Sequence, residues 1–152
     1  MPKLGEDKPL RQLFLAVALL LAAFGAAAEP ATHDYAVGQV WNYRTRPEDA
    51  GSLIRIGGIE DGANGPIYHI GVIGMHMPGM DTATSIGHLP VSRQTLDMSV
   101  TTLAKTNAAF PDMTGGIAQW RNAHGGVYTI SIADIMRTVA QTLGANAGSG
   151  KP

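Results

Sequence analysis

Three β-type segments separated by short polar turns restrict the fold more than any other feature of this sequence. In the first of them, Trp41 and Tyr43 fall on one face and Asn42 on the other, because side chains alternate along a strand. Aromatic and β-branched residues favour this state. The three segments are residues 37–45, 52–59 and 67–74. Because the turns between them are short, we expect an antiparallel meander.

Helix signals dominate the second half of the sequence. Ser92 is a favourable N-cap residue, and Leu96, Val100 and Leu103 follow it at spacings of four and three. This pattern predicts a helix from Ser92 to about Thr106.

Two further helices are expected after it. Asp112 is placed to cap a short helix that contains Trp120. Ser131 and Asp134 form a pair like a capping box, with Asp in place of the usual Glu. The last helix follows this pair, and Gly144 is expected to end it.

This order of elements predicts an α+β domain. Short strands are also expected at residues 86–91 and 127–130. The expected architecture is an antiparallel sheet of three to five strands, beginning with the N-terminal meander and covered on one face by two or three helices. We expect residues 29–144 to form this single domain and residues 145–152 to form a flexible tail.

The N-terminal segment has the organisation of a secretory signal peptide. A mildly basic stretch, residues 1–11, precedes the apolar run 13–24, and the small residues 26–28 follow. As a helix the apolar run spans about 18 Å, well short of the roughly 30 Å of a hydrocarbon core. The sequence therefore predicts a signal peptide over residues 1–28, no membrane insertion after cleavage, and a periplasmic or secreted protein.

Composition excludes several classes of function. The sequence has no cysteine, so disulfides, thiol catalysis and zinc–thiolate sites are absent. Lys and Arg number 11 against 12 Asp and Glu, with no basic run, which argues against nucleic acid as a partner. The expected partner is a cell-envelope or extracellular protein, or a small ligand.

A methionine- and histidine-rich segment is the sharpest local motif. It contains Met75, His76, Met77 and Met80 on an expected loop. We expect no cofactor. The alternative is copper, because thioether and imidazole ligands suit Cu(I). In the competing interpretation the methionines of this loop pack on the core.

Two further sets of residues are candidates for ligand binding. Arg44, Arg46 and Arg55 come from adjacent expected strands and would recognise an anion as a patch; alternatively they are solvated and paired with nearby carboxylates. His88 precedes the helix entry at Ser92, where it would act beside a cleft or hold the entry by a hydrogen bond.

Signatures of common enzymes are missing from the sequence. It has neither a Gly-x-Ser-x-Gly elbow nor a His-Glu-x-x-His motif. The C-terminal Gly-Ser-Gly-Lys-Pro lacks the residues and the position of a phosphate loop. No catalytic residue is assigned, and a protein that is not an enzyme is favoured.

Four stretches together resemble a known family. They are VGQVWNYRTRPEDAGSLIRI, IYHIGV, HLPVSRQTLDMSVTTL and VYTISIADIM. They resemble a family of small, uncharacterised exported proteobacterial proteins with a Val-x-x-x-Trp-x-Tyr-x-Thr-Arg-Pro start and a His-x-Pro-x-Ser helix entry. The resemblance covers most of residues 37–143 and implies one compact domain. It implies no activity, so no residue role follows from it.

Three hypotheses follow for the function. The first is an exported, non-enzymatic binding or interaction protein that uses the sheet edge and the loop 75–85. The second is a periplasmic copper-binding protein that uses the methionine- and histidine-rich segment. The third is a small hydrolase or lyase with a cleft near His88.

Overall fold

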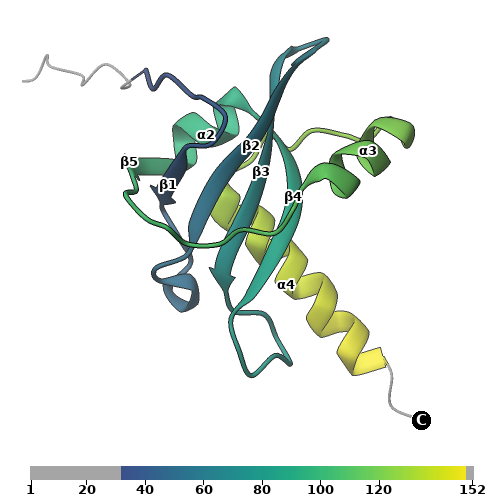
Figure 1. Ribbon diagram of the computed structural model, residues 1–152. Coiled ribbons are helices and arrows are strands. Elements are labelled where there is room, and N and C mark those ends of the chain that lie inside the picture. Colours follow the sequence, from purple (N-terminus) through teal and green to yellow (C-terminus); the bar gives the residue numbers. More distant parts are fainter. Residues whose placement is uncertain (1–31, 150–152) are drawn as a thin grey trace, which may run out of the picture. The chain divides into compact units, whose positions relative to one another are not determined.

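The computed structural model describes residues 32–149, and the predicted signal peptide lies outside this part of the chain. Figure 1 shows a sheet with helices packed around it. Its elements in chain order are β1 (Val40–Tyr43), the 3-10 helix η2 (Pro47–Asp49), β2 (Leu53–Gly62), β3 (Gly65–Met75), β4 (Thr84–Ser92), α2 (Arg93–Ser99), β5 (Val100–Leu103), α3 (Thr114–Asn122) and α4 (Ile132–Ser149). Among the described residues, no helix has the length and apolar character needed to cross a membrane.

The sheet has five strands in the order β4-β3-β2-β1-β5, and all neighbours are antiparallel. The expected N-terminal meander is confirmed, because β1 to β4 are consecutive neighbours. The turn between β2 and β3 is tight, with Gly62 opposite Gly65. Gly65 has a φ of 109°, a backbone conformation that glycine adopts without strain. The α+β class is therefore as expected.

One face of the sheet carries the main core and is covered by α2 and α4. Ile132, Ile135 and Met136 of α4 are fully buried there. They pack with aromatic and aliphatic side chains of the strands, among them Trp41, Tyr43, Ile54, Ile56, Tyr68, Ile70, Val72, Leu89 and Val91. Figure 1 shows α4 crossing behind the sheet.

The opposite face is covered as well, by α3 and the segment 104–113 that leads into it (Figure 1). The buried Met113 packs against glycines of this face. A Cβ at Gly57 would lie 2.4 Å from the Met113 sulfur, and one at Gly71 would lie 3.1 Å from its methyl carbon. Because Gly57 and Gly71 have no side chains, the segment 104–113 that leads into α3 can pack closely on the sheet.

The helix predicted from Ser92 to about Thr106 is shorter than expected. Ser92 does cap it, accepting a hydrogen bond from Thr95 N, but α2 ends at Ser99. Val100–Leu103 is strand β5, which pairs with β1. The β-branched run Val-Thr-Thr favours a strand. Strand β1 also provides backbone hydrogen-bond partners, which the spacing of apolar residues in the sequence could not indicate.

Two further expectations for the C-terminal part are wrong in detail. Residues 127–130 do not form a strand: Tyr128 makes an isolated parallel bridge with Val91. Helix α4 continues past Gly144 to Ser149, so most of the expected tail is helical. A glycine inside a helix costs only about 1 kcal/mol relative to alanine, so Gly144 alone does not end this helix. The cap at the start of α4 is confirmed, since Asp134 N donates to the Ser131 hydroxyl.

Candidate functional site

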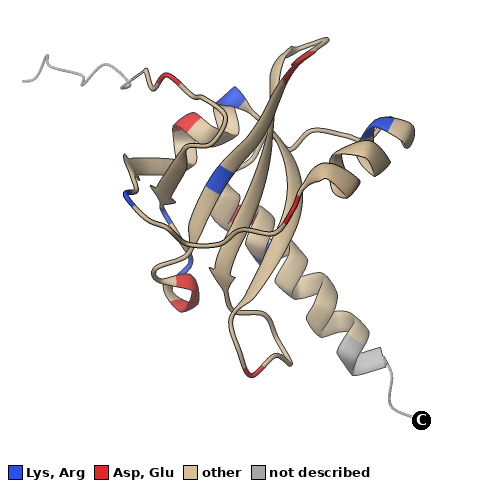
Figure 2. Cartoon of the chain, viewed as in Figure 1, with Lys and Arg blue, Asp and Glu red and all other residues tan. Residues whose placement is uncertain are grey.

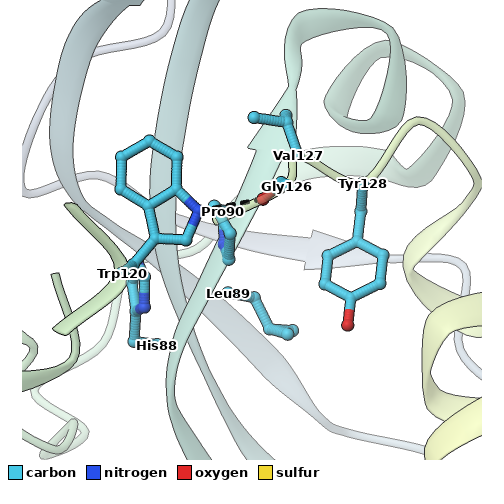
Figure 3. Close-up of a pocket in the computed structure, with 7 residues that line it drawn as sticks. All are labelled: His88, Leu89, Pro90, Trp120, Gly126, Val127 and Tyr128. Carbon is cyan, nitrogen blue, oxygen red and sulfur yellow. Dashed lines mark hydrogen bonds between the residues drawn. The ribbon is translucent and has the colours of Figure 1, made fainter. Parts of the chain in front are cut away.

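A pocket of about 440 Å³ lies between β4, α3 and the segment 126–128. Its walls are mainly apolar and aromatic, with one imidazole. The lining residues are His88, Leu89, Pro90, Trp120, Gly126, Val127 and Tyr128. In Figure 3, His88 and Trp120 lie together on one side of the pocket and Tyr128 on the other.

Backbone and side-chain hydrogen bonds fix the walls of this pocket. Tyr128 N donates to Pro90 O at 3.0 Å, and Ser92 N donates to Tyr128 O at 2.9 Å. On the α3 side, Trp120 Nε1 donates to Gly126 O at 2.9 Å (Figure 3). These bonds hold the segment 126–128 along the edge of β4, and so the pocket is formed before any ligand arrives.

A pair of histidines lies at the base of the site. His69 on β3 and His88 on β4 approach each other, and His69 Nδ1 is 2.8 Å from His88 Nε2, a hydrogen bond. His69 is 1% exposed, and Trp120 packs against its ring with the centroids 5.1 Å apart. His88 is half-buried and lines the pocket. The pair therefore connects the pocket to the interior of this face.

An ion pair continues the chain of polar groups beyond His69. Glu60 Oε2 on β2 lies 3.4 Å from His69 Nε2, without the geometry of a hydrogen bond. Arg121 on α3 donates from Nε to the same carboxylate oxygen at 2.9 Å. His69 Nε2 is buried and has no hydrogen-bond partner among the described residues. Such an orphaned group is costly and calls for an explanation.

The surroundings shift the pKa of the two histidines and of Glu60. Burial lowers the pKa of His69, and the Glu60 carboxylate only partly opposes it. Burial, and then the neighbouring His69, lower the pKa of His88. The hydrogen bond from Arg121 lowers the pKa of Glu60. At neutral pH the site therefore holds two neutral imidazoles and an ionised carboxylate paired with a guanidinium.

The three candidate arginines do not form one exposed patch. Arg46 is buried and donates two hydrogen bonds to Asp49, at 2.6 and 3.0 Å. Arg44 is exposed and donates to Met98 O, and Arg55 is exposed on β2. Figure 2 shows the basic residues of the described part dispersed over several elements. Of the predicted ligand-binding residues, His88 is the one placed in the pocket.

The methionine- and histidine-rich segment is divided between the core and the surface. Met75 and Met77 are buried in the main core, as in the competing interpretation, whereas Met80 is 49% exposed and His76 is exposed. The thioethers therefore lie in different surroundings. Within residues 32–149, no group of three or more His, Asp or Glu side chains is arranged to hold a metal ion.

Most residues of this site were not among the candidates that the sequence indicated. No binding role was expected for His69, Trp120, Glu60, Arg121 or Tyr128. The register of β3 against β4, which sets His69 opposite Pro90, is the signal that brings the two imidazoles together. That register depends on the loop 76–83, whose sequence has no period from which it could be derived.

Comparison of the chain with protein-family models, with curated proteins and with solved structures finds no match.

Proposed function

We propose that this protein binds a small organic molecule in the His88 pocket, and that it does so outside the cytoplasm as an exported protein. The proposal is based on one observation, a preformed pocket with aromatic and aliphatic walls and a single imidazole, that of His88. The buried His69 is hydrogen-bonded to this imidazole. Ligand pockets in proteins have this composition and are a few hundred Å³ in volume.

Binding is favoured over covalent catalysis by the residues that line the pocket. No Ser, Thr, Lys, Asp or Glu is among them, so the usual nucleophiles of a hydrolase are missing. The aromatic faces of Trp120 and Tyr128 suit a planar, mainly apolar ligand. His88 then provides the hydrogen bond that fixes its orientation.

The two tryptophans allow a test with an internal control. Both indole N–H groups are resolved in a ¹⁵N-labelled NMR spectrum, and Trp41 lies in the main core on the other face of the sheet. A panel of phenol, 4-nitroanisole, indole and 4-nitrophenol is titrated into the domain 29–149. We expect saturable shifts of the Trp120 Nε1–H signal while the Trp41 signal stays in place.

Variants at the pocket mouth provide a matched comparison. Tyr128 is 41% exposed and lines the pocket, whereas Ile130 is 44% exposed and does not. Replacing Tyr128 with Ala should weaken binding about tenfold, whereas Ile130→Ala should leave it unchanged. The proposal is wrong if no member of the panel shifts Trp120, or if Trp41 shifts equally.

A further inference from the structure

A second pocket adjoins the His88 pocket. It has a volume of about 520 Å³ and lies between the turn 62–67, the start of α2 and the segment 125–129. Gly126 and Val127 line both pockets, which therefore share a wall. A Cβ at Gly126 would meet nothing within 4 Å, so no side chain stands at this position between the two pockets. A ligand longer than the His88 pocket therefore has room to extend over this wall into the second one, which we call the Arg93 pocket.

Hydrogen bonds hold the two pockets at a fixed distance from each other. Ser92 N and Thr95 Oγ1, at the start of α2, both donate to Tyr128 O at 2.9 Å. Tyr128 lines the His88 pocket, and Arg93 directly follows Ser92 in the chain. The backbone that carries Arg93 is thus bonded to the segment that forms one wall of the His88 pocket.

The two pockets differ in charge. Among the described residues, no Lys, Arg, Asp or Glu lines the His88 pocket, whose walls are aromatic and aliphatic. Arg93 is the only residue of these four types in the described lining of the second pocket, which also has uncharged polar residues such as Asn64 and Gln94. A ligand that fills both pockets therefore meets apolar rings at one end and a positive charge at the other.

The guanidinium of Arg93 is fixed in place but keeps unused hydrogen-bond donors. Its Nη2 donates to His33 O at 2.8 Å, and its central carbon lies 5.2 Å from the centre of the Tyr35 ring. Its Nε lies 3.5 Å from Asp97 Oδ2 in an ion pair at the surface, a type that contributes about 0–1 kcal/mol. Nη1 has no hydrogen-bond partner among the described residues, and the side chain is 41% exposed. Since a guanidinium has five N–H donors in a planar fork, this one can bind a carboxylate through donors that the fold does not use.

We infer that the protein binds elongated aromatic carboxylic acids, with the ring in the His88 pocket and the carboxylate at Arg93. The acid is ionised at neutral pH, and it accepts hydrogen bonds from the guanidinium without the transfer of a proton. Its charge stays in the Arg93 pocket, so the apolar walls of the His88 pocket do not have to desolvate it. This inference rests on the proposed function and names the ligand class of the same site.

The test uses phenylalkanoic acids of increasing chain length, from phenylacetate to 5-phenylpentanoate, and the primary amide of each acid. The amides have nearly the same shape but no charge. Both series are titrated into the domain 29–149, and binding is measured from the shift of the Trp120 Nε1–H signal. We expect the acid whose chain spans the shared wall to bind about tenfold more tightly than its amide, whereas phenylacetate should have no such advantage. Added salt should reduce the advantage of the long acid.

Three variants test whether the advantage of the acid comes from this guanidinium. Arg93→Gln should lower the affinity for the long acid to that for its amide and leave the affinity for the amide unchanged. Asp97→Asn removes the carboxylate that competes for Arg93 and should raise the advantage of the acid about threefold. Arg137→Gln is the matched control, because Arg137 is also paired with a carboxylate on its own helix but lines neither pocket. This control should bind both compounds like the original protein.

The outcomes distinguish this inference from the proposed function. If acids and amides bind alike at every chain length, or if the advantage of the acid survives in Arg93→Gln, the inference is wrong and the binding function stands. The same conclusion follows if neither series binds while a compound of the fragment panel does. If no compound of either series or of the panel shifts the Trp120 signal, both proposals are wrong. Unchanged affinity for the amide establishes that a variant keeps the His88 pocket intact.

Discussion

At the scale of single residues, two buried polar pairs in this domain differ in how well their polar atoms are hydrogen-bonded. Asp49 is completely buried and accepts bonds from the Arg46 guanidinium and from His76 N, so its neighbours are well matched to its charge. This pair stabilises the turn after β1. In the His69–His88 pair, by contrast, the buried His69 Nε2 has no hydrogen-bond partner in the part of the chain that the structure describes. Buried polar groups without a partner cost stability, and in native proteins they are often found at functional sites.

The lowered pKa values of the two histidines predict a loss of stability in mild acid. Below about pH 6.5 the unfolded chain gains protons on both imidazoles, whereas the folded chain does not until a lower pH. The unfolded state then binds more protons, so the free energy of unfolding falls by at most about 1.4 kcal/mol per pH unit for each imidazole. Urea denaturation at about pH 7.5 and about pH 5.5 measures this change.

The control for this effect is a histidine in a different environment. His88→Gln should show a smaller dependence on pH than the original domain, because one of the two shifted groups is gone. His76→Gln, at an exposed position, should show the same dependence as the original domain. Equal pH dependence in all three proteins would contradict the assignment of the effect to the buried pair.

At the scale of elements, α3 is the least deeply packed helix, since none of its residues is buried. It is held by the Arg121–Glu60 ion pair, by Trp120 against His69, and by close approach to β4. A Cβ at Gly116 would lie 2.6 Å from His88 Cβ, whereas a Cβ at Gly115 would meet nothing within 4 Å. The position of α3, and with it the shape of the pocket, therefore depends on Gly116 and not on its neighbour Gly115.

Replacing these neighbouring glycines with alanine should have opposite effects on stability. Gly115→Ala fills open space and reduces the freedom of the unfolded chain, so it should stabilise the domain by roughly 0.5–1 kcal/mol. Gly116→Ala should push α3 away from His88 and destabilise the domain by about 1–3 kcal/mol. Denaturant unfolding measures both values, and the ¹⁵N signal of His88 Nε2 reports whether the histidine pair is disturbed in Gly116→Ala alone. A stabilising Gly116→Ala would show that α3 is not held in close contact with β4.

At the scale of the whole molecule, the two faces of the sheet have different roles. The face under α2 and α4 holds the main core, which in a chain without cysteine stabilises the domain without the help of disulfides. The face under α3 contains glycines, a histidine pair and the pocket. The first described residues are tied to α2, since Tyr35 donates to Asp97 and Arg93 donates to His33 O. The chain from His33 onwards is thus part of the folded domain.

The predicted signal peptide gives a test at the scale of the whole chain. When the full sequence is expressed in a bacterium, the protein recovered from the cell envelope or medium should begin at Glu29, which mass spectrometry measures. Leu19→Arg places a charge in the apolar run and should leave the intact chain, with Met1 or its processed form, in the cytoplasm. Lys3→Gln, in the same segment, should be exported nearly as well as the original. Recovery of the uncleaved original chain from the cytoplasm would overturn the export part of the proposal.

The sequence by itself determined the features that depend on neighbouring residues. Alternation predicted the first three strands, and the hydroxyls of Ser92 and Ser131 predicted two helix starts, because pleat and cap act within a few residues. Tertiary structure alone decided the rest. Strand β5 exists because β1 offers it partners, and His69 meets His88 because of a register between distant segments. Local sequence patterns do not specify which distant segments pair with each other. The fold class could therefore be predicted from the sequence, whereas the candidate site is formed only by the pairing of strands in the sheet.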